Sequence, residues 1–159
     1  MNFFNKYILS GLLFGILFGL VTKSAISGII GGILFGLIIS VFVKKQIKNF
    51  EKIKDEISKE NTIIFDGAAN HFMGKEAVGG WLYLTDKLLI FISHNNNIQN
   101  HEMIIPLAII QKVEKYLTLG VVPNGLKIIS VDEEDKFVVN DRKKWIQLLQ
   151  QKFENNIDI

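Results

Sequence analysis

The chain has 159 residues, enough for one ordinary domain and a modest addition. Its mean hydropathy of +0.26 and hydrophobic content of 48% are high for a soluble protein, although the formal net charge is only +2. There is no cysteine, which excludes disulfides, thiolate metal ligands and cysteine nucleophiles. Residues 61–159 carry ten basic and twelve acidic side chains. The basic surface that nucleic-acid binding requires is therefore not expected.

Residues 1–43 predict a transmembrane helical hairpin. Within residues 7–43 only Lys23 is charged. Ala25–Val43 is uncharged throughout and would extend roughly 28 Å as a helix, close to the thickness of the hydrocarbon core. Tyr7–Val21 is shorter, so a hairpin that enters the bilayer without crossing it remains an alternative. A cleaved signal peptide is disfavoured, because a second apolar segment follows at once.

The lysines that flank the hairpin predict its orientation. Lys44, Lys45 and Lys48 follow the second apolar segment, whereas Lys23 stands alone in the turn. Positive residues favour the cytoplasmic side of a membrane. The sequence therefore predicts a multi-pass protein of the cell membrane with both termini in the cytoplasm.

Glycine recurs every four residues in both apolar segments. The two series are Gly11, Gly15 and Gly19, and then Gly28, Gly32 and Gly36. Residues four apart share one helix face, and a face without side chains lets two helices approach closely in lipid. The pattern is similar to a glycine-zipper hairpin. It predicts close helix packing, either within the hairpin or with a second copy in a homo-oligomer.

Residues 44–60 predict a basic amphipathic juxtamembrane helix. Its apolar stripe is Ile47, Phe50, Ile53 and Ile57. Lys44, Lys45 and Lys48 are candidates for weak contact with membrane lipid, because lysine is attracted to an anionic leaflet. The alternative is a connector whose apolar stripe packs on the following domain.

From Asn61 the spacing changes to that of strands, rich in β-branched and aromatic residues. Seven strands are predicted, at Thr62–Phe72, Ala77–Leu84, Leu88–His94, Asn100–Ile105, Ile110–Thr118, Leu126–Val131 and Lys136–Asn140. Turn residues separate them, among them Pro123–Gly125. Asp141–Glu154 returns to helical spacing. The predicted fold class is therefore α+β, with a seven-stranded β-barrel or sandwich over residues 61–155 closed by a C-terminal helix.

One stretch of this domain resembles a known family. Residues 79–86, Gly-Gly-Trp-Leu-Tyr-Leu-Thr-Asp, are followed by Leu-Leu-Ile-Phe at 88–91 and by Ile-Pro-Leu at 105–107. This series is similar to the signature of the GRAM domain, a member of the pleckstrin-homology-like superfold. The resemblance covers about residues 61–152, and it is nearest to small bacterial versions. The composition, rich in Lys, Asn and Ile, fits a bacterial source.

The resemblance implies a module that binds lipids or proteins and carries out no catalysis. Phosphoinositide-binding relatives use basic residues near the first strand-to-strand loop, where this chain offers Lys75 but no basic cluster. Lys75 is therefore only a weak candidate for lipid contact. Trp81 and Trp145 are predicted to be structural core residues.

No residue pattern in the chain predicts an active site. His94 and His101 flank the turn at 95–100 and could face each other across a hairpin, but no third metal ligand stands at suitable spacing. The acidic run at 132–135 is interpreted as a solvated turn. No catalytic residue, metal site or cofactor is predicted, and the protein is not expected to be an enzyme.

Two functional classes remain. In the first, the protein is a membrane-tethered adaptor whose GRAM-like domain binds lipid headgroups or a protein partner at the cytoplasmic face. In the second, the hairpin oligomerises and affects membrane integrity or transport, and the domain regulates it. The first is preferred, because the domain makes up most of the chain and is the more specific match.

Overall fold

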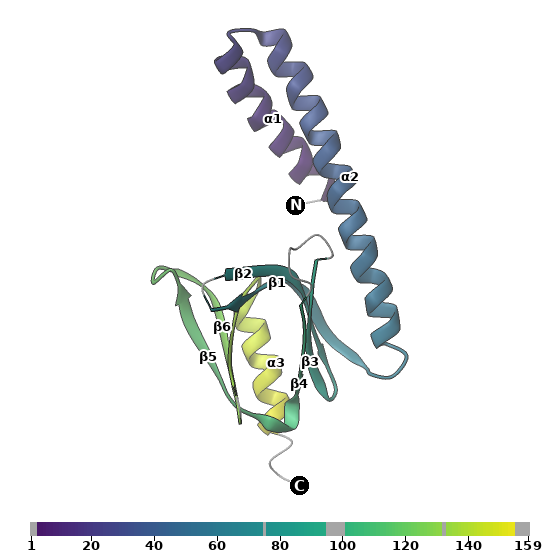
Figure 1. Ribbon diagram of the computed structural model, residues 1–159, viewed down its shortest axis with the longest axis vertical. Coiled ribbons are helices and arrows are strands. Elements are labelled where there is room, and N and C mark those ends of the chain that lie inside the picture. Colours follow the sequence, from purple (N-terminus) through teal and green to yellow (C-terminus); the bar gives the residue numbers. More distant parts are fainter. Residues whose placement is uncertain (1–2, 75, 95–100, 132, 155–159) are drawn as a thin grey trace. The chain divides into compact units, whose positions relative to one another are not determined.

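The computed structural model describes residues 3–74, 76–94, 101–131 and 133–154 (Figure 1). The chain divides into two compact units, with the boundary between Ile53 and Lys54. The N-terminal unit is a helical hairpin. The C-terminal unit is a curled antiparallel sheet that holds one helix.

The hairpin consists of α1 (Phe3–Thr22) and α2 (Ala25–Ile57). Lys23 lies between them with a positive φ of 52°, which reverses the chain in a very short turn. Helix α2 continues through Lys44 without a break, so residues 44–57 extend the apolar helix instead of forming a separate one. Among the described residues, α2 is long and apolar enough to cross a membrane, whereas the apolar part of α1, Ile8–Thr22, is shorter.

The two glycine series lie against each other. A Cβ atom added to Gly15 would lie 2.7 Å from the backbone oxygen of Gly28, and one added to Gly32 would lie 2.7 Å from that of Gly11. Such distances leave no space for even a methyl group. Separating two helices in lipid exposes no apolar surface to water, so the hydrophobic effect does not hold them together. Close packing of this kind provides the attraction instead.

The C-terminal unit contains seven strands and two helical segments. They are β1 (Ile63–Met73), β2 (Glu76–Thr85), β3 (Leu88–Ser93), β4 (Glu102–Pro106), the 3₁₀ turn η1 (Leu107–Ile109), β5 (Ile110–Thr118), β6 (Val122–Ser130), β7 (Glu134–Val139) and α3 (Arg142–Glu154). All neighbouring strands are antiparallel, in the order β4-β3-β2-β1-β7-β6-β5. The predicted seven strands and closing helix are confirmed.

The core lies on the concave side of the sheet, where α3 is enclosed by the strands (Figure 1). Alternate residues of each strand point inward, for example Leu82 and Leu84 of β2 and Phe137 and Val139 of β7. From α3, Trp145 is only 1% exposed and its ring lies edge-on to Phe65 at 4.8 Å between ring centroids.

The prediction that Trp81 belongs to the core is wrong. Because Leu82 points into the core, its neighbour Trp81 points to the opposite face of the sheet. There Trp81 is half-buried, and its indole Nε1–H donates to Asp66 Oδ2 at 2.9 Å. The ammonium group of Lys54 pairs with the same carboxylate. Tyr83, on this face, has its pKa raised by burial and then by the nearby Asp66 charge.

The predicted turn at Pro123–Gly125 is also wrong, because these residues lie within β6. The Tyr116 ring of β5 lies over Gly125, where a Cβ atom would come within 2.5 Å of it, so a larger residue inside the strand would have to displace that ring. The reversal occurs earlier, at Leu119 and Gly120. Their φ angles are 54° and 76°, and Val121 N–H donates to the Thr118 carbonyl at 3.2 Å. Two successive positive φ angles define a type I′ turn.

Leu119 is an unusual residue for this turn. Type I′ positions are usually Asn, Asp or Gly, since a left-handed conformation costs other residues about 1–2 kcal/mol. The turn could not be predicted from the residues alone, because leucine and valine at 117–122 are typical of the middle of a strand.

The glycine contacts predict unequal tolerance of substitution at two adjacent positions. Gly32→Leu should force α1 and α2 apart, because its neighbours are the backbones of Gly11 and Gly15. Gly31→Leu is the control, since Gly31 faces only the Phe18 side chain, which can rotate. Distances between spin labels on cysteines introduced at Leu13 and Leu34 in reconstituted protein should lengthen only for Gly32→Leu. Equal distances in both variants would show that the glycine contact does not hold the hairpin together.

The core position of Trp145 predicts a large effect on stability. Trp145→Ala should lower the free energy of unfolding by roughly 3–5 kcal/mol, because it leaves a cavity between α3 and the sheet. Gln147→Ala, at an exposed position of the same helix, should change it by less than about 0.5 kcal/mol. Urea unfolding of the full chain in detergent micelles, followed by circular dichroism, measures both. Similar values for the two variants would rule out this account of the core.

Candidate functional site

A polar cluster lies inside the apolar core of the sheet, built around His71 of β1. His71 is 5% exposed and occupies an inward position, two residues after the core residue Ala69. Its ring stacks on Phe137 of β7 at 4.8 Å between centroids and is tilted against Phe91 of β3 at 5.5 Å. A polar ring in such surroundings is stable only if both of its nitrogens have partners.

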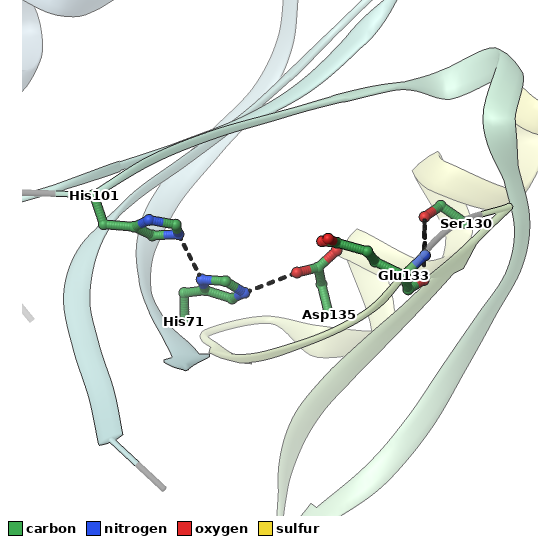
Figure 2. Close-up of polar contacts among 5 residues, drawn as sticks. All are labelled: His71, His101, Ser130, Glu133 and Asp135. Carbon is green, nitrogen blue, oxygen red and sulfur yellow. Dashed lines mark hydrogen bonds and ion pairs between the residues drawn. The ribbon is translucent and has the colours of Figure 1, made fainter. Parts of the chain in front are cut away.

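Both nitrogens of His71 are paired (Figure 2). Nε2 lies 3.0 Å from Asp135 Oδ1, and Nδ1 lies 3.0 Å from Nε2 of His101. Asp135 is a buried, inward-facing residue at the start of β7. His101 lies just before β4, where its backbone N–H donates to Ser93 Oγ at 2.7 Å and its carbonyl accepts from Ser93 N–H at 2.9 Å. The three side chains are thus held by β1, by β7 and by the residue that precedes β4.

The partners determine where the protons lie. A carboxylate can only accept, so His71 donates from Nε2 to Asp135. A neutral His71 then accepts at Nδ1 from the Nε2–H of His101.

The environment of His101 disfavours its charged form. Burial lowers its pKa first, the neighbouring His71 lowers it further, and Asp135 partly opposes both by raising it. Burial also lowers the pKa of His94. Both imidazoles are therefore harder to protonate in the folded chain than in the unfolded chain.

The sequence left open a contact between His94 and His101, and the structure gives His101 a different partner. His101 contacts His71 instead, while His94 lies beside β2, where a Cβ atom on Gly79 would be 3.2 Å from His94 Cδ2. The turn at 95–100 lies outside the described residues. His71 and Asp135 could have been noticed as polar residues at core-facing positions of their strands. Their mutual contact could not, because it depends on the pairing of β1 with β7.

The cluster is a continuous series of hydrogen bonds from Asp135 through His71 to His101. In the part of the chain that the structure describes, no three His, Asp or Glu side chains are arranged to hold a metal ion. The neighbouring residues of the acidic run lie in different surroundings. Asp135 points inward, while Glu134 forms ion pairs with Lys127 and Lys136 at 3.3 and 2.8 Å. The backbone of Glu133 bonds to Ser130 Oγ (Figure 2).

The predicted lipid-contact lysines of the helix belong to the other unit of the chain. Lys44, Lys45 and Lys48 are exposed on α2, in the N-terminal unit. Lys75 lies outside the described residues. The six glycines of the predicted helix contact lie in the hairpin, as described above.

The fold of the C-terminal unit is that of pleckstrin-homology domains. The C-terminal domain of an unknown protein from Leishmania infantum matches with a TM-score of 0.56 and 14% identity, over 67% of this chain and 97% of that chain. The Vps36 N-terminal PH domain matches with a TM-score of 0.52 and 18% identity, over 64% of this chain and 85% of that chain. At such identities the likeness establishes the fold alone.

The sequence also matches the profile of the GRAM domain over residues 44–155, and the chain therefore belongs to the GRAM domain family. The match begins at Lys44, so it includes the last turns of α2, whereas the resemblance in the sequence was limited to residues 61–152. No curated protein sequence matches the chain.

The lowered pKa of His101 predicts a stability that depends on pH. Below the ordinary histidine value of about 6.5 the unfolded chain binds more protons than the folded one, so stability should fall as the pH falls from about 7 to about 5. Unfolding of the full chain in detergent at several pH values measures this slope. His101→Gln should make the slope shallower, and His94→Gln should do so independently. A double variant with the slope of the native chain would contradict the assignment.

Proposed function

We propose that this protein is a membrane-tethered, non-enzymatic adaptor. Its GRAM domain binds lipid headgroups or a protein partner at the cytoplasmic face of the cell membrane, with both chain termini on that side. The observation that carries the proposal is the direct connection of a GRAM domain to α2, a helix apolar and long enough to cross a bilayer.

The lysines near the membrane support a contact with anionic lipid. Lys44, Lys45 and Lys48 are exposed and follow the apolar part of α2 at once. Each lysine beside an anionic leaflet contributes about 1 kcal/mol of attraction. The tether raises the effective concentration of headgroups at the domain, so a weak binding site is sufficient.

The arrangement of the polar cluster supports a function without catalysis. A serine nucleophile needs a histidine nitrogen as its base, but both nitrogens of His71 are bonded to Asp135 and His101. Ser93, whose Oγ accepts from the His101 backbone N–H, is held by a backbone group. These hydrogen bonds support a structural role for the cluster within the domain.

The hairpin could instead be the active part, acting as an oligomer on membrane integrity or transport. The glycines that would mediate such an assembly are packed on one another within a single hairpin. For this reason the adaptor is the preferred function.

The test compares the full chain in nanodiscs of neutral phosphatidylcholine with the chain in nanodiscs containing phosphatidylglycerol. Amide hydrogen exchange should be slower in the domain and in the turns of α2 after Lys44 when the lipid is anionic. The triple substitution Lys44→Gln, Lys45→Gln, Lys48→Gln should abolish the difference. The matched control is Lys87→Gln, Lys112→Gln, Lys136→Gln, three other lysines exposed in the domain, and it should retain the difference.

Each result distinguishes the two ligand classes. Identical exchange in both discs would eliminate the lipid form of the adaptor. Cross-linking in native membranes then tests the protein form, which requires a partner that depends on the GRAM domain. Failure of both experiments would reject the adaptor altogether.

A further inference from the structure

We propose that the tip of the β5–β6 hairpin, residues 117–122, inserts its apolar side chains into the membrane to which α2 tethers the chain. The occupant of this surface is the bilayer itself. The inference rests on the tether of the proposed function, but not on headgroup binding or on a protein partner.

The tip exposes apolar side chains on both strands of the hairpin. Leu119 is 89% exposed and Val121 75%, and they are flanked by Leu117 at 51% and Val122 at 39%. No charged residue interrupts the segment from Leu117 to Val122. The hairpin projects from the sheet, with its tip away from the middle of α3 (Figure 1). Among the described residues of the domain, this run of exposed apolar side chains lies outside the core.

The backbone of the tip gives an independent reason to assign it a function. Leu119 has a φ of 54° at the first central position of the type I′ turn. Asparagine would adopt this conformation more easily and would be better solvated. A strained residue that is also the most exposed apolar residue at the tip is not explained by the stability of the domain.

The size of the tip favours a bilayer over a folded partner. Four side chains on a narrow turn are too small for a stable protein interface, which buries roughly 800 Å² on each partner. A bilayer accepts a few side chains at a time and gains from each that leaves water. Basic residues lie behind the tip: Lys115 is two residues before Leu117, and it lines a shallow cleft together with Lys143 of α3. These cations suit the headgroup layer above an inserted tip.

The tether is short enough for the tip to reach the bilayer. The part of α2 after Lys44 extends roughly 20 Å. A domain of about a hundred residues has a radius of gyration of about 13 Å, hence a diameter larger than that extension. The domain follows α2 after only five residues, Ser58–Thr62. It therefore stays within reach of the membrane surface.

The experiment measures the depth of the tip directly in the full chain. The chain has no cysteine, so Leu119→Cys or Val121→Cys accepts a single NBD fluorophore. In nanodiscs of neutral phosphatidylcholine, NBD at either position should show blue-shifted emission and quenching by lipids that carry a nitroxide on the acyl chain. Ile104→Cys is the matched control, because Ile104 is an exposed apolar residue on the edge strand β4. NBD there should remain in water and unquenched.

A second variant separates insertion from folding. Leu119→Asn should leave the melting temperature equal or higher, because it relieves the left-handed leucine. It should nevertheless lower the ratio of inserted to free tip by roughly tenfold or more, read from NBD at Val121→Cys.

Emission typical of water at both tip positions would overturn the proposal. So would equal quenching at Ile104, or protection from water without quenching by lipid, which would indicate a protein contact. Neutral lipid makes the result independent of the headgroup experiment. If hydrogen exchange is the same in neutral and anionic nanodiscs while NBD at the tip is quenched by lipid, headgroup binding is rejected and insertion of the tip is retained.

Discussion

The structure of the GRAM domain depends on the burial of one apolar face of a curled sheet. An antiparallel sheet of seven strands whose concave face is apolar cannot leave that face in water. Helix α3 covers that face with Trp145, Ile146 and Leu149. Helix α3 is the last element of the chain, and β4 and β5 form the two edges of the sheet that encloses it.

The same enclosure explains the buried polar cluster. Once the sheet curls, the inward residues of β1 and β7 share a small volume with the residue that precedes β4. His71 would be costly in such a place by itself, but Asp135 and His101 satisfy both of its nitrogens. The cluster therefore joins three distant parts of the chain by hydrogen bonds.

Two kinds of apolar surface serve different purposes in the chain. In the hairpin, glycines remove side chains so that two backbones meet, since lipid offers no hydrophobic gain from association. At the tip of β5–β6, large side chains are instead kept outside the core, on a backbone that leucine does not favour. The glycine contact keeps the membrane anchor of the proposed function compact. The inserted tip of the further inference gives the tethered domain a second contact with the bilayer.

The sequence by itself determined the seven strands, the closing helix and the family, and it placed the glycines of each apolar segment on one helix face, because these follow from local periodicity and from motifs. Only the tertiary structure decided which polar groups meet. His71 and Asp135 are 64 residues apart, and their contact arises from the register of β1 on β7. Likewise, a proline, an asparagine and a glycine at 123–125 predict a turn locally. In the structure Gly125 instead pairs with Tyr116 across the hairpin, and the reversal occurs at Leu119 and Gly120.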